Sequence, residues 1–252
     1  MHECPSDLTG QTAVVTGASR GVGYAIAVGL LRAGADVVTL QRADPGPELE
    51  AAAGARGRRL THHSVDLASE ASIREVTENV LADQQVDILV NNAGAQMRND
   101  AIDFPLGDLD ATMNINFRAV FQLCQAFGAP MVERRRGKII NLASMLSFQG
   151  GVRTSAYAAS KGAVVQLTKA LCNEWAARGV NVNAVAPGYL ATEMTEALRA
   201  DPTRSQEISA RIPAARWGTP GDVVGPVVFL ASAAADYVNG AVIPVDGGWL
   251  AR

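Results

Sequence analysis

The chain has 252 residues, of which 48% are hydrophobic and 19% are charged, and its formal net charge is −3. This composition is typical of a globular protein and excludes a disordered or fibrous one. The longest run of basic residues, 134–136, is predicted to be a solvated helix end, so we expect no nucleic-acid partner. No apolar stretch reaches the roughly 20 residues of a membrane helix, and residues 1–7 do not resemble a signal peptide.

The cysteine and histidine residues argue against disulfides and metal sites. Cys4, Cys124 and Cys172 are odd in number and widely spaced, which indicates reduced thiols in a reducing compartment. His62 and His63 are neighbours on an expected strand, where successive side chains point to opposite faces. We therefore expect a cytoplasmic protein without a membrane partner and without a bound metal.

Apolar runs and turn residues define the expected elements in chain order. A β-branched strand at 12–16 precedes an apolar helix at 21–32, which Gly34 ends. The polar stretch 42–57 is interpreted as a loop with a poor helix. Further strands are expected at 36–40, 59–65, 86–90, 138–142, 180–185 and 241–245, and further helices at 70–82, 109–132 and 155–177.

Strands that alternate with helices predict βαβ units and a parallel sheet covered by helices on both faces. The strands are nearly continuous apolar runs, as such a buried sheet requires. The expected fold is α/β, a doubly wound Rossmann-type sheet, formed as one domain over residues 1–252. Ligands of such folds bind beyond the carboxyl ends of the strands.

A glycine-rich turn joins the first strand to the first helix. Gly17, Gly21 and Gly23 allow a tight turn and a close approach of backbone to a pyrophosphate, which the helix N-terminus also favours. A purely structural turn is the alternative. The position that would hold an acid in an NAD-binding protein is Gln41, followed by Arg42, and Arg20 can reach the same region. Two guanidinium groups favour NADP(H), whereas Asp44 can offset the charge of Arg42.

Tyr157 and Lys161 are four residues apart on one expected helix and therefore share a face. An ammonium and a positively charged nicotinamide both favour a phenolate, so Tyr157 is the predicted acid/base. Ser144 follows the 138–142 strand and can hold the substrate oxygen. Asn116 lies mid-helix, where asparagine is unfavourable, and can position a proton-relaying water for Lys161. The alternative for Asn116 is a solvent-facing or back-bonded side chain.

Two further strand ends face the expected cofactor site. Asn92, Ala93 and Gly94 follow the fourth strand; we expect the Asn92 side chain to be structural and the backbone to line the site. Asp66 and Leu67 follow the third strand, where the adenine ring is expected.

Taken together, these residues resemble the short-chain dehydrogenase/reductase family from about residue 8 to 248. The resemblance rests on Thr-Gly-x-x-x-Gly-x-Gly, Asn-Asn-Ala-Gly, Asn116, Ser144, Tyr-x-x-x-Lys and Pro187-Gly188 in that order. It implies a seven-stranded parallel sheet, a homotetramer, and a tetrad of Asn116, Ser144, Tyr157 and Lys161. It also implies that Thr192 lies with Pro187 and Gly188 at the nicotinamide, and that basic residues at 20 and 42 accompany NADP(H). The expected cofactor site comprises Gly17, Ser19, Arg20, Gly21, Val22, Gly23, Gln41, Arg42, Asp66, Leu67, Asn92, Ala93, Gly94, Tyr157, Lys161, Pro187, Gly188 and Thr192.

From residue 138 onward the chain resembles more closely a subfamily of sugar-acid dehydrogenases that act on 2-dehydro-3-deoxy-D-gluconate. The resemblance lies in 138–151, 186–189, 211–213, 225–232, 236–240 and 245–252. It implies the interconversion of a hydroxyl and a ketone, with Ser144, Gln149 and Tyr157 at the small-molecule substrate. Arg98 and Arg153 are candidate carboxylate anchors, or else surface or subunit-contact arginines. That subfamily tends to have two adjacent arginines where this chain has Met97-Arg98. The subfamily is also usually associated with NAD.

Two other functions remain open from the sequence. One is a 3-oxoacyl-(acyl-carrier-protein) reductase, which residues 192–195 also resemble; the other is a nucleotide-sensing binding protein, which commonly lacks the tyrosine or lysine. The helices at 109–132 and 155–177 and the C-terminal tail are the expected subunit interfaces.

Overall fold

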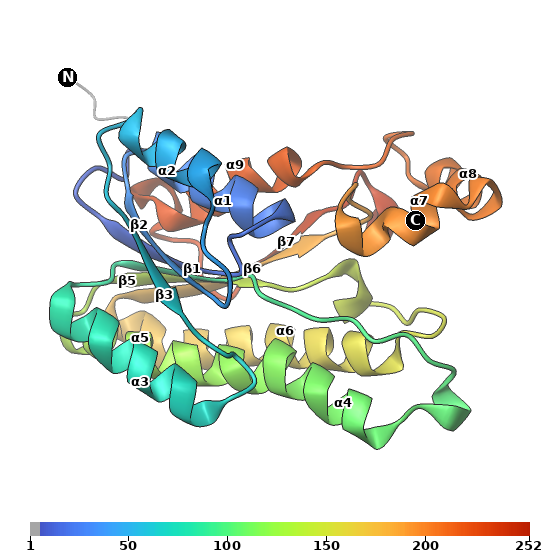
Figure 1. The fold of residues 1–252 in the computed structure, drawn as a ribbon, viewed down its shortest axis with the longest axis horizontal. Helices are drawn as coiled ribbons and strands as arrows, with labels where there is room; N and C mark the ends of the chain where they lie inside the picture. Colours follow the sequence, from blue (N-terminus) through green and yellow to red (C-terminus); the bar gives the residue numbers. More distant parts are fainter. Residues whose placement is uncertain (1–5) are drawn as a thin grey trace.

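The computed structural model describes residues 6–252, which form one parallel seven-stranded sheet (Figure 1). The strand order is β3-β2-β1-β4-β5-β6-β7. The strands are β1 (Thr12–Thr16), β2 (Asp36–Gln41), β3 (Leu60–Ser64), β4 (Ile88–Asn91), β5 (Gly137–Leu142), β6 (Val180–Pro187) and β7 (Val242–Val245). This topology confirms the predicted α/β class, and every strand boundary lies within two residues of its predicted position. His2 and Cys4 lie outside the described residues.

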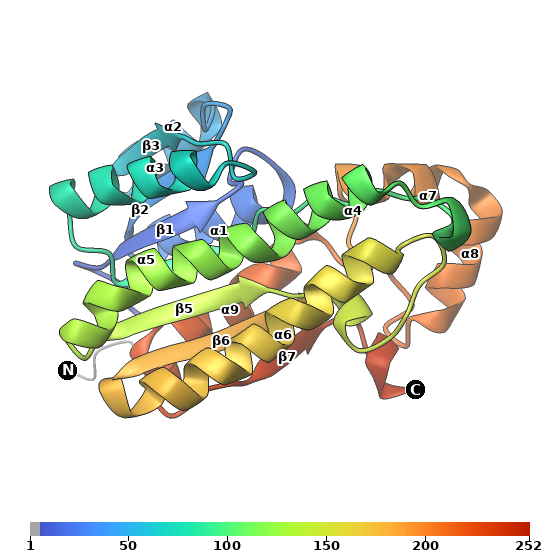
Figure 2. The same cartoon turned by 90° about the horizontal axis from the view of Figure 1, so that it is seen from below.

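Helices cover both faces of the sheet, so its apolar side chains form two separate cores. On one face lie α1 (Gly21–Arg32), α2 (Pro47–Gly54) and α9 (Val224–Ala231), and on the other α3 (Glu70–Asp83), α5 (Ala119–Glu133) and α6 (Ser155–Trp175) (Figures 1 and 2). Because side chains alternate along a strand, Val15 joins the first core and Val14 the second.

Residues 47–54 are the helix within the stretch that was expected to be a loop with a poor helix. Pro47 occupies the first turn of α2, where a missing N–H costs nothing, and Glu48 and Glu50 favour its positive end. Leu49 and Ala53 are buried against α1. Tertiary packing therefore completes a helix that the sequence pattern indicates only weakly.

The long helix expected at 109–132 is divided into three parts. It begins earlier, as α4 (Leu106–Met113), passes through a π-helical turn (Asn114–Arg118) and continues as α5. Helix α6 ends at Trp175, followed by a 3-10 turn and Gly179 with φ 75°. A Cβ at Gly179 would lie 2.0 Å from the Arg135 carbonyl oxygen, so only glycine fits this helix end.

Two helices not predicted from the sequence follow β6 at one end of the molecule, α7 (Glu196–Ala200) and α8 (Pro202–Arg211) (Figure 1). Asp201 caps α8 by accepting bonds from the amides of Thr203 and Arg204. Ile208 is the buried residue of α8, and it joins Met145 and Trp249 in a small apolar cluster. These helices are thus held to the body by few apolar contacts.

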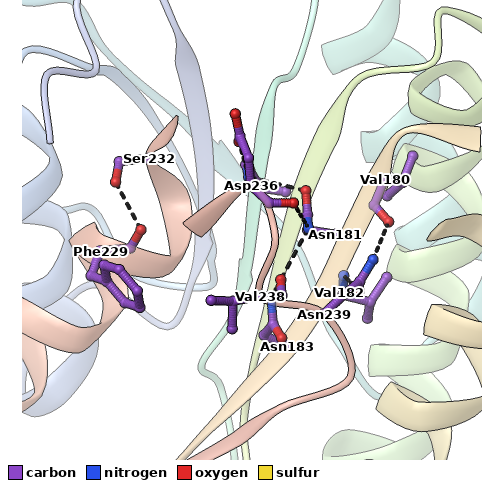
Figure 3. Close-up of polar contacts among 10 residues, drawn as sticks. Val180, Asn181, Val182, Asn183, Phe229, Ser232, Asp236, Val238 and Asn239 are labelled. Carbon is purple, nitrogen blue, oxygen red and sulfur yellow. Dashed lines mark hydrogen bonds and ion pairs between the residues drawn. The ribbon is translucent and has the colours of Figure 1, made fainter. Parts of the chain in front are cut away.

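Asparagine side chains fix the segment before β7 onto β6 (Figure 3). Asn181 donates to the carbonyls of Asp236 and Val238, and Asn239 accepts from the Val182 amide and donates to Val180. Lys138 lies 2.6 Å from the Asp236 carboxylate. A hollow of about 560 Å³ borders these residues, but it lies where β5 and β6 begin, at the edge opposite to the glycine-rich turn.

The arginine run 134–136 is only partly solvated, which corrects the expectation for Arg134. Its side chain is largely buried, donates to the Val86 carbonyl and lies 3.9 Å from the Asp87 carboxylate. Burial lowers the pKa of Arg134, and Asp87 opposes that shift. Arg135 and Arg136 are exposed. Across residues 6–252, no helix combines the length and apolarity needed to span a bilayer.

Candidate active site

The glycine-rich turn between β1 and α1 has the shape that a dinucleotide requires. Gly17 and Gly21 have φ of 67° and 58°, in the left-handed region. A Cβ at Gly23 would lie 2.1 Å from the Gly17 carbonyl oxygen and 2.4 Å from Asn92 Nδ2. Arg20 precedes α1 without a side-chain cap, so the first amides of this helix are available to a phosphate. Ser19 is exposed and Val22 half-buried beside them.

The turn after β4 is tied to the glycine-rich turn. The amides of Asn92 and Ala93 both donate to the buried Thr16 hydroxyl at 2.9 Å. Asn92 Nδ2 donates to the carbonyls of Thr16 and Gly17 at 2.9 and 3.1 Å. The two strand ends on either side of the point where strand order reverses are therefore held together, and a parallel sheet binds its ligand at that point.

At the end of β2, Gln41 Nε2 donates to the Ala43 carbonyl, while Gln41 Oε1 is buried without a partner among the described residues. A buried acceptor of this kind fits a ribose hydroxyl. Arg42 is exposed. Asp44 lies 3.7 Å from His62 Nε2. Together with the glycine cradle, these residues fit a nicotinamide dinucleotide.

The third strand ends at the residues expected to face the adenine. Asp66 is exposed and accepts from the Ala68 amide, and Leu67 packs against the second core. Both residues therefore lie at the carboxyl end of β3, as the sequence predicts.

Tyr157 and Lys161 lie on one face of α6, and Lys161 Nζ is 5.9 Å from the centre of the Tyr157 ring. Lys161 is 3% exposed, and its ammonium donates to the Leu142 carbonyl. A Cβ on Gly94 would lie 3.3 Å from Asn116 Oδ1 and 3.7 Å from Lys161 Nζ. The structure therefore brings Gly94, Asn116 and Lys161 together.

Asn116 occupies the π-helical turn and is fully buried. Its side chain accepts from the Ala95 amide, donates to the Ala95 carbonyl and donates to the Ser160 hydroxyl. Neither the solvent-facing nor the back-bonded alternative describes it. Ser160 in turn donates to the Tyr157 carbonyl at 2.8 Å, so Asn116 is linked to the backbone that carries the tyrosine. A π turn is often found at a functional site.

Ser144 begins a 3-10 turn after β5 and is 8% exposed. Its hydroxyl accepts from the Leu146 amide, while the Ser144 amide donates to Ser147 Oγ. Ser147 donates to the Lys161 carbonyl at 2.8 Å. The loop that carries Ser144 is thereby joined to the helix that carries Tyr157 and Lys161.

Burial controls the ionisation of both residues. It raises the pKa of Tyr157 above its ordinary value, and the Ser144 hydroxyl opposes that shift. It lowers the pKa of Lys161 to about 8. The sequence predicted that charge would favour the phenolate, but within the protein itself desolvation of the phenolate outweighs its stabilisation by neighbouring groups.

The nicotinamide end of the expected site follows β6. Pro187 ends β6, and a Cβ on Gly188 would lie 2.7 Å from Asp246 Cα, so this turn packs against the end of β7. Thr192 precedes a 3-10 turn (Glu193–Thr195), and its amide donates to the Thr195 hydroxyl. Glu193 in this turn lies 3.1 Å from Arg20.

The candidate substrate residues are placed differently from one another. Arg153 has φ 61° and lies 3.4 Å from Asp100, whereas exposed Arg98 forms no side-chain hydrogen bond or ion pair within residues 6–252. Gln149 lines a hollow of about 600 Å³ with Lys169, Val242 and the C-terminal Arg252. Within the described chain, no group of three or more His, Cys, Asp or Glu side chains is arranged to hold a metal ion.

Sequence reasoning assigned no role to several residues that hold the site in place. Thr16, Ser147 and Ser160 supply the hydroxyls that join its loops. Asn91 donates to Asn141 at 2.8 Å inside the sheet, and Asn141 donates to Thr168 on α6. An amide in an otherwise apolar strand, as at 141, was the available signal, because a buried amide needs partners.

A glycine-rich turn with the shape for a phosphate lies at the point where strand order reverses, and with a tyrosine–lysine pair it is typical of a nicotinamide-dependent oxidoreductase. Residues 17–250 match a family model described as enoyl-(acyl carrier protein) reductase. The 2-dehydro-3-deoxy-D-gluconate 5-dehydrogenase of Escherichia coli strain K12 is 49% identical over 247 residues, which cover 97% of each chain.

Solved structures agree with this match. A candidate NAD(P)-dependent gluconate 5-dehydrogenase of Beutenbergia cavernae, with NADP bound at low occupancy, has a TM-score of 0.96 at 51% identity, covering 99% of this chain and 100% of that one. The gluconate 5-dehydrogenase of Burkholderia cenocepacia J2315, in complex with NADP and tartrate, has a TM-score of 0.94 at 39% identity, covering 98% of each. This chain belongs to the short-chain dehydrogenase/reductase family and is an NAD(P)-dependent oxidoreductase acting on a CH–OH group.

Proposed function

We propose that this enzyme interconverts a secondary alcohol and a ketone on a deoxy sugar acid of the 2-dehydro-3-deoxy-D-gluconate type, with NADP(H) preferred. The observation that carries the chemistry is the Tyr157 ring 5.9 Å from the buried Lys161 ammonium. The substrate class rests on the full-length similarity to the Escherichia coli enzyme, whose name gives that substrate.

In this proposal Tyr157 is the acid/base. In the oxidation direction its ionised oxygen removes the hydroxyl proton, and in reduction its hydroxyl returns that proton to the substrate oxygen. Ser144 holds the same oxygen by a hydrogen bond. The bound nicotinamide supplies the hydride acceptor or donor. Lys161 stabilises the ionised tyrosine by its charge, and Asn116 positions the helix through Ser160 and the tyrosine carbonyl.

We propose Arg98 as the anchor of the substrate carboxylate. It follows the turn after β4, beside the residues that line the site, and its guanidinium has no partner within residues 6–252. Arg153 is already paired with Asp100, so recruiting it would require that pair to break. A guanidinium can bind a carboxylate through two parallel hydrogen bonds.

The NADP(H) preference is supported by the end of β2. Gln41 carries no charge that would repel a 2′-phosphate, Arg42 is exposed, and Asp44 lies by His62. Two related structures contain NADP. We further propose a cytoplasmic homotetramer, because Leu106 and Phe121 expose apolar surface on α4 and α5, where a second copy can pack.

The test combines activity with cofactor binding. Purified enzyme should oxidise 2-dehydro-3-deoxy-D-gluconate, measured as nicotinamide absorbance, with a higher kcat/KM for NADP than for NAD. Tyr157→Phe should lose turnover yet bind the cofactor as before, because only the hydroxyl that carries the transferable proton is removed. Turnover in that variant comparable to wild type would reject the role of Tyr157. Activity on a 3-oxoacyl thioester alone would reject the substrate class.

A further inference from the structure

An ion pair connects two loops that follow strands separated by two others in the sheet. Arg20 precedes α1 in the glycine-rich turn, and Glu193 lies in the 3-10 turn after β6, with 3.1 Å between guanidinium nitrogen and carboxylate oxygen. Both side chains are largely exposed, at 76% and 64%. Within residues 6–252 it is the one ion pair that joins the glycine-rich turn to the segment after β6.

The strand order shows what this pair spans. β4 and β5 lie between β1 and β6, so at about 4.8 Å per strand the pair joins loops that follow strands roughly 14 Å apart at the carboxyl edge. That edge includes the point of strand reversal, where a dinucleotide binds. Gln41 and Arg42 follow β2, which pairs with β1 on its other side.

Arg20 therefore lies between two anion positions on opposite sides of β1. A 2′-phosphate would lie by Arg42, toward β2, and the Glu193 carboxylate lies toward β6. The Arg20 guanidinium that bonds the Glu193 carboxylate is therefore not free to pair with a phosphate at the same time. In the structure the Arg20 side chain is paired with Glu193.

We propose that Glu193 determines cofactor selectivity by competing with the 2′-phosphate for Arg20. NADP(H) gains the Arg20 contact only when the pair with Glu193 breaks, whereas NAD(H) has no such phosphate and leaves the pair intact. Glu193 thus weakens the binding of one cofactor without touching the other. An exposed pair of this kind changes an equilibrium by up to about fivefold.

The inference rests on the proposed use of Arg20 by NADP(H), and direct binding tests it. Dissociation constants for NADPH and NADH would be measured by nicotinamide fluorescence with wild type and Glu193→Gln, which keeps the size of the side chain. The variant should bind NADPH about three- to fivefold more tightly and NADH within twofold of wild type. Glu196→Gln, exposed on α7 and without an ion pair within the described residues, is the matched control and should change neither constant.

A double-mutant cycle locates the effect. In a background of Arg20→Gln, the further change Glu193→Gln should leave the NADPH constant unchanged, because the contested cation is gone. Equal tightening for both cofactors, no tightening for NADPH, or a gain that persists without Arg20 would each overturn the inference. Tighter wild-type binding of NADH than of NADPH would overturn the proposed preference for NADP(H). The role of Glu193 would still be decided by whether Glu193→Gln changes the NADPH constant and leaves the NADH constant as it is.

Discussion

Replacing Lys161 by methionine should change how stability depends on pH. Burial lowers the pKa of Lys161 from 10.5 to about 8. At about 1.4 kcal/mol per pKa unit, holding this lysine charged costs the folded protein on the order of 3 kcal/mol. Between about pH 8 and pH 10.5 the unfolded chain binds a proton that the folded protein does not, so the free energy of unfolding rises with pH.

The assay is urea denaturation of wild type and Lys161→Met at pH 7 and at pH 10. From the lower to the higher pH, wild type should gain about 2 to 3 kcal/mol relative to the variant. Loss of the hydrogen bond to the Leu142 carbonyl lowers the free energy of unfolding of the variant by about 1 kcal/mol at both pH values. It therefore leaves the difference between the two pH values unchanged. Lys169→Met, exposed on the same helix, is the control and should follow wild type. A stability difference between wild type and Lys161→Met that does not vary with pH would refute the reasoning.

Two further predictions concern the glycine-rich turn and the free thiols. Gly23→Ala should abolish cofactor binding in a fluorescence titration, since its Cβ would lie 2.1 Å from the Gly17 carbonyl oxygen. The control is Gly162→Ala in α6, where a Cβ meets open space: it should bind the cofactor normally, and its free energy of unfolding should rise by about 1 kcal/mol. Cys124 is buried with a pKa raised to about 12, so maleimide at pH 8 should label half-buried Cys172 before Cys124, as located by peptide mass. Faster labelling of Cys124 would show that this part of α5 opens.

The strands and the residues at their ends could be predicted because their signals are local. Nearly continuous apolar runs indicate β1, β2 and β5, and the positions of residues that follow them, such as Gly17 and Ser144, follow from the direction of a parallel strand. The spacing of Tyr157 and Lys161 indicates a shared helix face, and the structure places them on one.

The remaining features depend on contacts that no local pattern reveals. Helix α2 is completed by burial of Leu49 and Ala53, and α8 has a single buried side chain, Ile208, so the apolar face of each rests on one or two side chains. The buried position of Arg134 depends on Asp87, far away in sequence. The direction of the Tyr157 pKa shift likewise follows from its burial in the folded chain.

Because of the π-helical turn at Asn114–Arg118, the continuous helix formed by α4, this turn and α5 cannot change in length without changing the site or the core. A π turn contains one residue more than an α turn, and it is this residue that sets the rotation of α4 relative to α5. Deleting one residue here would turn everything on one side by about 100°. Asn116 would lose Ala95 and Ser160, or Leu123 and Phe127 would leave the core. Insertions and deletions should therefore be excluded from this helix even where substitutions are tolerated.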